Sequence, residues 1–418
     1  MINDNADKII PQAESKAPAR RFPEFRNSPP WQKTPLDSTG KIVTGKTPDT
    51  GDDTLWNGKI AFVTPTDIDG SKYQYSTNRF VNVPNSRALP VGSIMYTCIA
   101  SIGKMSITTK PSITNQQINS IIVENYHNEF VYYALANISS YIKSTQANTT
   151  LPIINKTTFA KFTIFVPVQN KEQEKIAACL SSVDNLISTK QTELESLKKY
   201  KKGLLQQLFP QGNNNFPALR FPEFKNMWIA DKIINIADYV DYRGKTPEKV
   251  SQGIFLVTAK NIKMGYIDYN ASQEYVSRDD YEIVMRRGLP EIGDVLITTE
   301  APLGNIASVD RKDVAFAQRV IKYRGKENIL HNPFLKYIML SDDFQKKIDN
   351  LSTGGTAKGI KGSTLHEIKI RFTSSWTEQK KIADCLTSLD SLIELKQQEL
   401  NKLSHYKKGL LQQLLVQG

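Results

Sequence analysis

The chain has 418 residues, 39% of them hydrophobic and 23% charged, which is typical of a globular protein with two or three domains. Its formal net charge of +12 favours a polyanionic partner such as nucleic acid. Three cysteines are too few for a disulfide framework, and the N-terminus lacks the apolar stretch of a signal peptide. No apolar run is long enough to span a membrane. The sequence therefore predicts a cytoplasmic protein whose repeated cysteines, Cys179 and Cys385, are core thiols.

Residues 1–20 are polar and predict a loose tail.

Two short motifs each occur twice, once near the start of each half of the chain. Arg21–Phe25 recurs as Arg220–Phe224, and Gly45–Pro48 recurs as Gly244–Pro247, both pairs 199 residues apart. Such internal repetition indicates an architecture built from two similar parts.

The sequence of each half predicts a globular part of mixed α/β (α+β) class. Apolar residues at helical spacing predict helices near 128–142 and 333–351. Runs rich in β-branched and aromatic residues, bounded by Gly, Pro, Asn and Asp, predict strands. These strands are expected at 59–64, 93–99, 120–123, 162–166, 254–258, 294–299, 314–320 and 368–373.

Each half ends in a long helix, and the two helices are nearly the same sequence. Residues 172–208 and 378–414 align without a gap, and 25 of the 37 pairs are identical. Their apolar residues alternate spacings of four and three, which is typical of a coiled coil. This seam is interrupted only by lysines, at 190, 201, 396 and 407. Its apolar members are Ile176, Leu180, Val183, Ile187, Leu194, Leu197, Leu204, Leu208, Ile382, Leu386, Leu389, Ile393, Leu400, Leu403, Leu410 and Leu414.

A helix of this length needs a partner that covers its apolar stripe. The other copy in the same chain is the simplest partner, so we expect an antiparallel coiled coil with a pseudo-two-fold plan. The alternative is that each helix packs only on its own globular part. Further apolar positions beside the seam widen the stripe and favour an additional helical partner. These positions are Leu186, Leu205, Leu392 and Leu411.

The sequence shows no convincing catalytic or cofactor site. Gly40–Thr47 matches the phosphate-loop pattern, but Pro48 disfavours the helix that must begin there, and turn chemistry is the better interpretation. The four histidines have no metal-ligand spacing. We therefore expect a non-catalytic chain that binds no cofactor or metal itself.

The repeated motifs together resemble the DNA-specificity subunit of type I restriction–modification systems. The resemblance rests on the paired Gly-Lys-Thr-Pro segments, the Glu-Gln-x-Lys-Ile-Ala openings at 172–177 and 378–383, and the paired Tyr-Lys-Lys-Gly-Leu-Leu-Gln-Gln-Leu endings. It covers nearly the whole chain from Phe22 onward. It implies two target-recognition domains on two long helices, bound to double-stranded DNA, two modification (methyltransferase) subunits and restriction subunits. S-adenosylmethionine, ATP and Mg²⁺ would then belong to those partner subunits.

The expected division follows from the repeats and the resemblance. It comprises a polar tail (1–20), a first target-recognition domain (21–170), a spacer helix (171–209), a linker (210–220), a second target-recognition domain (221–376) and a second spacer helix (377–418).

We expect each domain to read one half of a bipartite DNA target while the helices set the gap. Polar side chains in the unlike parts are the candidate DNA contacts. The alternatives are a two-domain scaffold that recruits proteins through its helices, and a single-chain enzyme; the divergence of the domains and the missing catalytic motifs argue against them. The candidate contacts are Lys46, Lys104, Gln116, Gln117, Lys245, Lys260, Asn261, Gln318, Arg319, Lys358 and Lys361.

Overall fold

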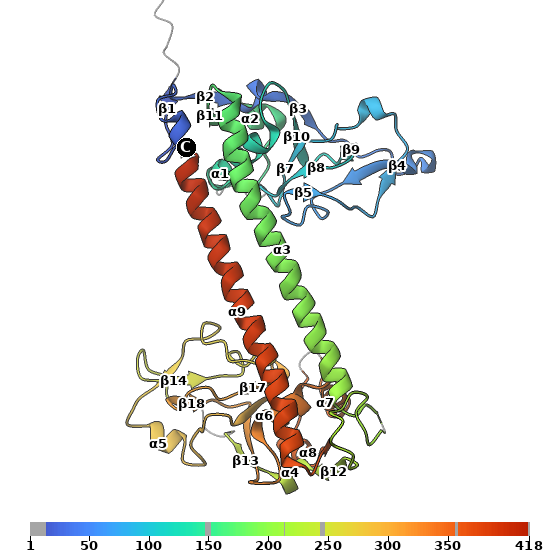
Figure 1. Cartoon of the computed structure of the whole chain (residues 1–418), viewed down its shortest axis with the longest axis vertical. Coiled ribbons are helices and arrows are strands. Elements are labelled where there is room, and N and C mark those ends of the chain that lie inside the picture. Colours follow the sequence, from blue (N-terminus) through green and yellow to red (C-terminus); the bar gives the residue numbers. More distant parts are fainter. Residues whose placement is uncertain (1–13, 147–151, 213, 243–246, 356–357, 417–418) are drawn as a thin grey trace, which may run out of the picture. The chain divides into compact units, whose positions relative to one another are not determined.

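The computed structural model describes residues 14–146, 152–212, 214–242, 247–355 and 358–416. The chain forms two compact units (Figure 1). Unit 1 comprises Met1–Gln191 and Gln398–Gly418, and unit 2 comprises Thr192–Gln397. Each unit therefore contains one globular part and a section of both long helices, α3 (Asn170–Leu208) and α9 (Trp376–Leu414).

The strands of unit 1 form small sheets around a buried central strand. The side chains of β7 (Ile94–Thr97) and of the first four residues of β10 (Ile118–Val123) are buried, as expected for strands with neighbours on both sides. The strand orders are β1 (Ser15–Lys16), β2 (Trp31–Pro35), β11 (Thr163–Val166); β3 (Gly40–Thr44), β10 (Ile118–Val123), β7 (Ile94–Thr97), β8 (Met105–Thr108), β5 (Tyr73–Gln74); and β6 (Phe80–Val81), β4 (Trp56–Val63), β9 (Ser112–Thr114).

Two helices complete the globular part of unit 1. In α1 (Asn128–Ser144), the apolar residues that share one core include Phe130 and Leu135. The shorter α2 (Lys156–Lys161) begins where the Asn155 side chain accepts a hydrogen bond from the Thr158 amide. Their core also contains residues from both ends of the chain, from Trp31 to Val416.

Unit 2 repeats this plan with different details. A core shared by its sheet and helices again includes residues from α3 and α9. The strand orders are β12 (Ile229–Lys232), β20 (Lys369–Phe372); β13 (Ala237–Asp241), β19 (Val320–Gly325), β16 (Val295–Thr299), β17 (Leu303–Ser308); and β15 (Tyr275–Val276), β14 (Ile254–Val257), β18 (Val314–Phe316). The helices are α4 (Ile233–Ile236), α5 (Tyr281–Val284), α6 (Asn332–Leu340), α7 (Asp342–Leu351) and α8 (Gly362–His366).

Two elements expected from the sequence are divided in the structure. The expected strand 314–320 is β18 followed by a turn and then β19. The expected helix 333–351 breaks at Ser341, whose backbone is extended and whose hydroxyl accepts a hydrogen bond from the Phe344 amide (3.4 Å). A serine that caps a new helix ends the one before it, so α6 and α7 are separate.

Inside unit 1, the start of α3 and the end of α9 run antiparallel. Lys407 of α9 binds Asp184 of α3 (Nζ to Oδ1, 2.5 Å), and Lys190 of α3 binds Glu399 of α9 (3.4 Å). Higher numbers on one helix therefore pair with lower numbers on the other. Both lysines occupy interruptions of the apolar seam, so these interruptions supply the ion pairs that hold the register.

Inside unit 2, the same two contacts recur with the helices exchanged. Lys201 of α3 binds Asp390 of α9 (Nζ to Oδ1, 2.5 Å), and Lys396 of α9 binds Glu193 of α3 (3.4 Å). The exchange follows from the repeat, because Lys201 corresponds to Lys407 and Asp390 to Asp184. Each unit is thus held by the same pair of contacts.

The apolar seam positions are covered to different degrees. Ile176, Leu180, Leu194, Leu208, Ile382, Leu386, Leu400 and Leu414 are buried. Val183, Ile187, Leu197, Leu204, Leu389, Ile393, Leu403 and Leu410 are half-buried. The buried members at the helix ends belong to the core of a globular part. Each helix therefore packs on its own globular part as well as on the other helix. Both the expected coiled-coil contact and the alternative contact with the globular part are present.

A buried glutamate anchors the start of each long helix. Glu172 accepts two hydrogen bonds from Arg21 (2.6 Å each) and one from the Trp31 indole (3.3 Å). Glu378 accepts two from Arg220, at 2.7 and 2.9 Å. The repeated Arg-Phe-Pro-Glu-Phe motif thus ties its arginine to the helix by a bidentate pair, the stronger form of such a contact.

Part of the expected loose tail is ordered by contacts within unit 1. Ser15 and Lys16 pair with β2, and the Arg20 amide donates to the Gln413 carbonyl of α9 (2.9 Å). In unit 2 the Leu219 amide donates to the Gln207 carbonyl in the same way (2.9 Å). The expectation of a loose tail was therefore wrong for residues 15, 16 and 20, because their backbone groups are paired.

The three cysteines differ in exposure. Cys98 is buried, Cys179 is half-buried and Cys385 is exposed. The expectation that Cys385 is a core thiol was wrong, because this position of α9 lies outside the covered seam of the helix.

Leu386→Ala should lower the free energy of unfolding of unit 2 by about 2–5 kcal/mol, since it leaves a cavity at a side chain with no exposed surface. Leu395→Ala, nine residues further on the same helix, removes a side chain that is 62% exposed and should change it by less than about 0.5 kcal/mol. Hydrogen exchange during urea unfolding would measure both variants. Equal effects of the two variants would contradict the packing described here.

Candidate nucleic-acid interface

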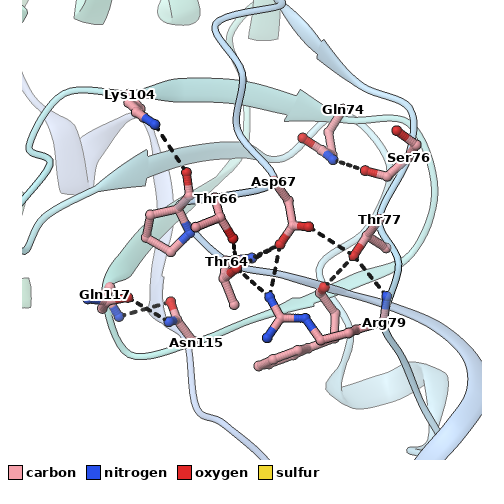
Figure 2. Close-up of polar contacts among 12 residues, drawn as sticks. Thr64, Thr66, Asp67, Gln74, Ser76, Thr77, Arg79, Lys104, Asn115 and Gln117 are labelled. Carbon is pink, nitrogen blue, oxygen red and sulfur yellow. Dashed lines mark hydrogen bonds and ion pairs between the residues drawn. The ribbon is translucent and has the colours of Figure 1, made fainter. Parts of the chain in front are cut away.

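In unit 1, two turns lie at one edge of a small sheet. The strands β4 and β9 are parallel, with Val63 opposite Thr114, so the turns that follow them meet at the same edge. The Asp67 carboxylate closes the first turn by accepting from the Thr64 amide (2.8 Å) and hydroxyl (2.7 Å). In the second turn, the Asn115 amide donates to the Val63 carbonyl (3.2 Å). Figure 2 shows both turns together.

An arginine lies against the first of these turns (Figure 2). Nη2 of Arg79 donates to the Thr64 hydroxyl (2.5 Å) and to the Asp67 carboxylate (3.2 Å). Its guanidinium carbon lies 5.2 Å from the centre of the Phe62 ring. The Arg79 side chain is 46% exposed, whereas that of Asp67 is 14% exposed. Arg79 was not expected from the sequence, because no motif links it to a turn twelve residues earlier.

The candidate residues of the first domain gather near these turns. Lys104 is exposed, and its ammonium lies 3.4 Å from the Pro65 carbonyl. Gln117 is half-buried and accepts from the Asn115 amide group (2.9 Å). Gln116 is exposed and binds the hydroxyl of Thr47, the residue after Lys46, at 2.8 Å. The structure therefore brings the Gly-Lys-Thr-Pro segment to the same edge.

The Gly-Lys-Thr-Pro segment of unit 1 does not form a phosphate loop. Residues 45–49 have no regular structure and no helix begins at Lys46 or Thr47. They line a pocket of about 450 Å³ whose walls include Leu55, Val83 and Ile113. A phosphate loop needs a helix N-terminus at its lysine, so the rejection of this motif is confirmed.

Unit 2 builds the same edge with different side chains. The strands β14 and β18 are parallel, with Val257 opposite Phe316. The turn after β14 is closed by Asn261, whose Oδ1 accepts from the Thr258 amide (3.0 Å) and hydroxyl (2.8 Å). Asn261 thus takes the place that Asp67 has in unit 1, while the neighbouring Lys260 is exposed.

Asn261 serves the fold of unit 2 and has no group left for a base. Its side chain has no exposed surface, and its Nδ2 donates to the carbonyls of Asp268 and Ser272 (2.9 Å each). A side chain whose donor and acceptor atoms are all used internally cannot read DNA. We therefore remove Asn261 from the candidate contacts.

The remaining candidates of unit 2 lie around Glu300. Arg319 is exposed, has a left-handed backbone (φ 71°) and binds the Glu300 carboxylate (Nε to Oε1, 2.9 Å). Glu300 forms a β-bridge with Gly359, which places the segment of Lys358 and Lys361 beside it.

These candidate side chains differ in their exposure and in their ion pairs. Lys358 is exposed and binds Asp349 (2.5 Å), Lys361 is exposed, and Gln318 is half-buried. The last candidate, Lys245, lies outside the described residues. Four candidates of unit 2 thus come from two segments that meet at one turn.

A hydrogen-bonded aspartate links each globular part to both long helices. The Tyr133 hydroxyl donates to Asp184 (2.6 Å), the carboxylate that also binds Lys407. In unit 2 the Tyr337 hydroxyl donates to Asp390 (2.8 Å), which binds Lys201. Burial, together with the neighbouring aspartate, raises the pKa of each tyrosine far above its usual range. Both hydroxyls therefore remain protonated donors at physiological pH.

Several large apolar side chains of the long helices face solvent. In unit 1 these are Leu186 (43% exposed) and Tyr406 (58%), and in unit 2 they are Leu392 (40%), Leu395 (62%) and Tyr200 (60%). The repeat relates Leu186 to Leu392 and Tyr200 to Tyr406. The same kind of apolar surface is therefore present in both units.

The described residues contain neither a metal cluster nor a membrane-spanning helix. These residues contain no group of three or more His, Cys, Asp or Glu side chains placed to hold a metal ion. Within the same part of the chain, every helix is too short or too polar to cross a membrane.

Comparison with known proteins gives consistent matches over most of the chain. The family model described as type I restriction modification DNA specificity domain matches residues 29–199 and again 233–405. The specificity subunit of the type I restriction enzyme MjaVIII from Methanocaldococcus jannaschii is 26% identical over 405 residues, covering 92% of each chain.

Two solved structures share the fold. The type I restriction–modification S subunit from M. genitalium has a TM-score of 0.60 and 17% identity, covering 96% of this chain and 99% of that one. A chain from work on complex assembly and conformational transition of the type I R-M system has a TM-score of 0.55 and 15% identity, covering 92% and 97%. With two matched domains and the same fold, this chain belongs to the family of type I restriction–modification DNA specificity subunits.

Proposed function

We propose that residues 21–170 and 221–376 are two target-recognition domains, each reading one half of a bipartite DNA sequence. One observation carries this proposal: the same edge of paired turns is built twice on a shared frame, with unlike side chains. A shared frame with different polar groups is what two readers of two different half-sites require. A scaffold that only recruits proteins has no need of that difference.

The candidate contacts fall into two chemical groups. Exposed lysines suit phosphate oxygens, which position a protein on the duplex, and amide or guanidinium groups suit base edges. On this basis the contacts to phosphate are Lys46, Lys104, Lys245, Lys260, Lys361 and Lys358, the last after release from its ion pair with Asp349. The contacts to bases are Gln116, Gln117, Gln318 and Arg319.

The long helices are proposed to set the gap between the half-sites and to dock methyltransferase subunits. Ion pairs at matching places in both units support a defined helix register. The exposed apolar residues, such as Leu186 and Leu392, support a docking surface that occurs twice. Two modification subunits would fit that repetition, and restriction subunits would join the assembly.

The chemistry of the complex would then belong to these partners in the cytoplasm. The modification subunits would bind S-adenosylmethionine, and the restriction subunits would use ATP and Mg²⁺. This chain would supply the sequence recognition.

Exchanging residues 221–376 for the matching segment of a relative should change one half of the methylated sequence, because each domain reads one half. The other half and the gap should stay the same. Methylated sites would be mapped after this chain is combined with its modification subunits, and the chain alone serves as the inactive control. A swap that alters both halves would contradict the modular reading.

Inserting seven residues after Lys190 and after Lys396 should widen the gap by roughly three base pairs. A heptad adds about 10 Å of helix at 1.5 Å per residue and preserves the apolar seam, and DNA rises about 3.4 Å per base pair. Insertion at one place should be tolerated less well, and two residues instead of seven should prevent assembly. If methylation mapping shows an unchanged gap, the helices do not set the distance between the half-sites.

Lys46→Gln should weaken DNA binding at all sequences and make the dependence of log K on log[salt] shallower by about 0.9, the value for one lost phosphate contact. Lys59→Gln is the matched control, because Lys59 is exposed on β4 four residues before the strand ends at the paired turns. Titration of labelled duplex at several salt concentrations measures both slopes. Equal slopes for the two variants would remove Lys46 from the interface.

A further inference from the structure

We propose that Arg79 reads a guanine in the half-site of unit 1 and that Asp67 is the positioning residue which aims its guanidinium. This inference rests on the proposed function, because it names one base contact of the first target-recognition domain. It assigns a role to an arginine that the structure places against the first of the paired turns of unit 1.

Arg79 is held from one side and exposed on the other. Its backbone is tied to the sheet edge, since the Phe62 amide donates to the Arg79 carbonyl (2.9 Å) and the Arg79 amide donates to the Thr77 hydroxyl (3.2 Å). Among the described residues, the hydrogen bonds of its side chain use Nη2 alone, to Thr64 and Asp67. The Phe62 ring covers one face of the guanidinium. Donors on Nε and Nη1 thus remain for a ligand, in a side chain that has already lost much of its rotational freedom.

Guanine fits such an arginine better than the other bases do. In the major groove, guanine presents two adjacent acceptors, O6 and N7, and no donor, so its edge can accept from the free Nη1 group. The Asp67 carboxylate bound to the same guanidinium fixes the orientation of those donors, which lowers the entropy lost on binding. Asp67 is itself held by the Thr64 amide and by Thr77, so it is a firm support (Figure 2).

The carboxylate also argues against a phosphate as the ligand of Arg79. Asp67 lies 3.2 Å from the guanidinium and cancels much of the positive charge that a phosphate would meet. The neutral acceptors of a base are less affected by this negative charge. Exposed lysines are better suited to phosphates, and Lys46 is one of them.

Unit 2 provides an internal control for the role of Asp67. Its matching turn is closed by the neutral Asn261 through the same two hydrogen bonds from a threonine. An asparagine therefore suffices for the fold of this turn, and the negative charge of Asp67 is needed for something else. We infer that this charge serves Arg79.

The test uses the complex of this chain with its modification subunits and maps methylated sites in a randomised DNA library. Arg79→Gln and Arg79→Lys should relax one guanine position in one half-site, lowering discrimination there by about 10- to 100-fold, while the other half and the gap stay unchanged. Asp67→Asn should relax the same position to a smaller extent, because the turn survives as it does around Asn261. Arg26→Gln, which removes an exposed arginine of the N-terminal segment, should leave the recognised sequence unchanged.

Three results would overturn the inference. The recognised sequence could stay the same in Arg79→Gln and Arg79→Lys, or Arg79→Lys could retain full discrimination, which would show that only charge matters. Binding could also weaken equally at all sequences with a shallower salt dependence, which would indicate a phosphate contact. If Arg79→Gln does not fold, the Asp67→Asn variant provides the test. An unchanged recognised DNA sequence in that variant overturns the inference. A wild-type complex that methylates no bipartite sequence would instead refute the proposed function.

Discussion

One aspartate in each unit connects three elements, and the arrangement of the unit depends on it. Asp184 lies on α3, binds Lys407 of α9 and accepts the hydroxyl of Tyr133 from the globular part. Asp390 does the same for α9, Lys201 and Tyr337. A helix pair held by apolar contacts alone could slide by a turn with little loss of contact. A charged pair that is partly buried has only one good position, so these lysines define the register at some cost in apolar surface.

On this fixed frame, the edge of each globular part that carries the paired turns can vary. The turns after parallel strands are held by backbone hydrogen bonds and by one side chain, Asp67 or Asn261, that bonds a threonine. The exposed side chains on these turns, such as Thr66 in unit 1 and Lys260 in unit 2, lie outside the core and differ between the units. The side chains proposed to recognise DNA can therefore change without disturbing the helices. This agrees with the near identity of the α3 and α9 sequences and with the divergence of the two globular parts.

The change from Asp67 to Asn261 shows how a small substitution can alter such an edge. The two side chains have nearly the same shape and close the same turn. The carboxylate additionally holds an exposed arginine, whereas the amide donates to two carbonyls and becomes buried. Unit 2 instead presents Arg319 with Glu300 from different turns. Each edge thus carries an arginine beside a carboxylate, supplied from different positions of the chain.

The sequence by itself determined the repeat, the two long helices, the seam and the family, because these depend on local spacing and on motifs that recur along the chain. The strand regions around β4, β7 and β14 also follow from local patterns of apolar residues. Tertiary structure decided which side chains meet. Asp67 and Arg79 are twelve residues apart in an irregular segment, and only the sheet brings them together. The burial of Asn261, the break at Ser341 and the exposure of Cys385 likewise depend on neighbours far along the chain, which no local pattern encodes.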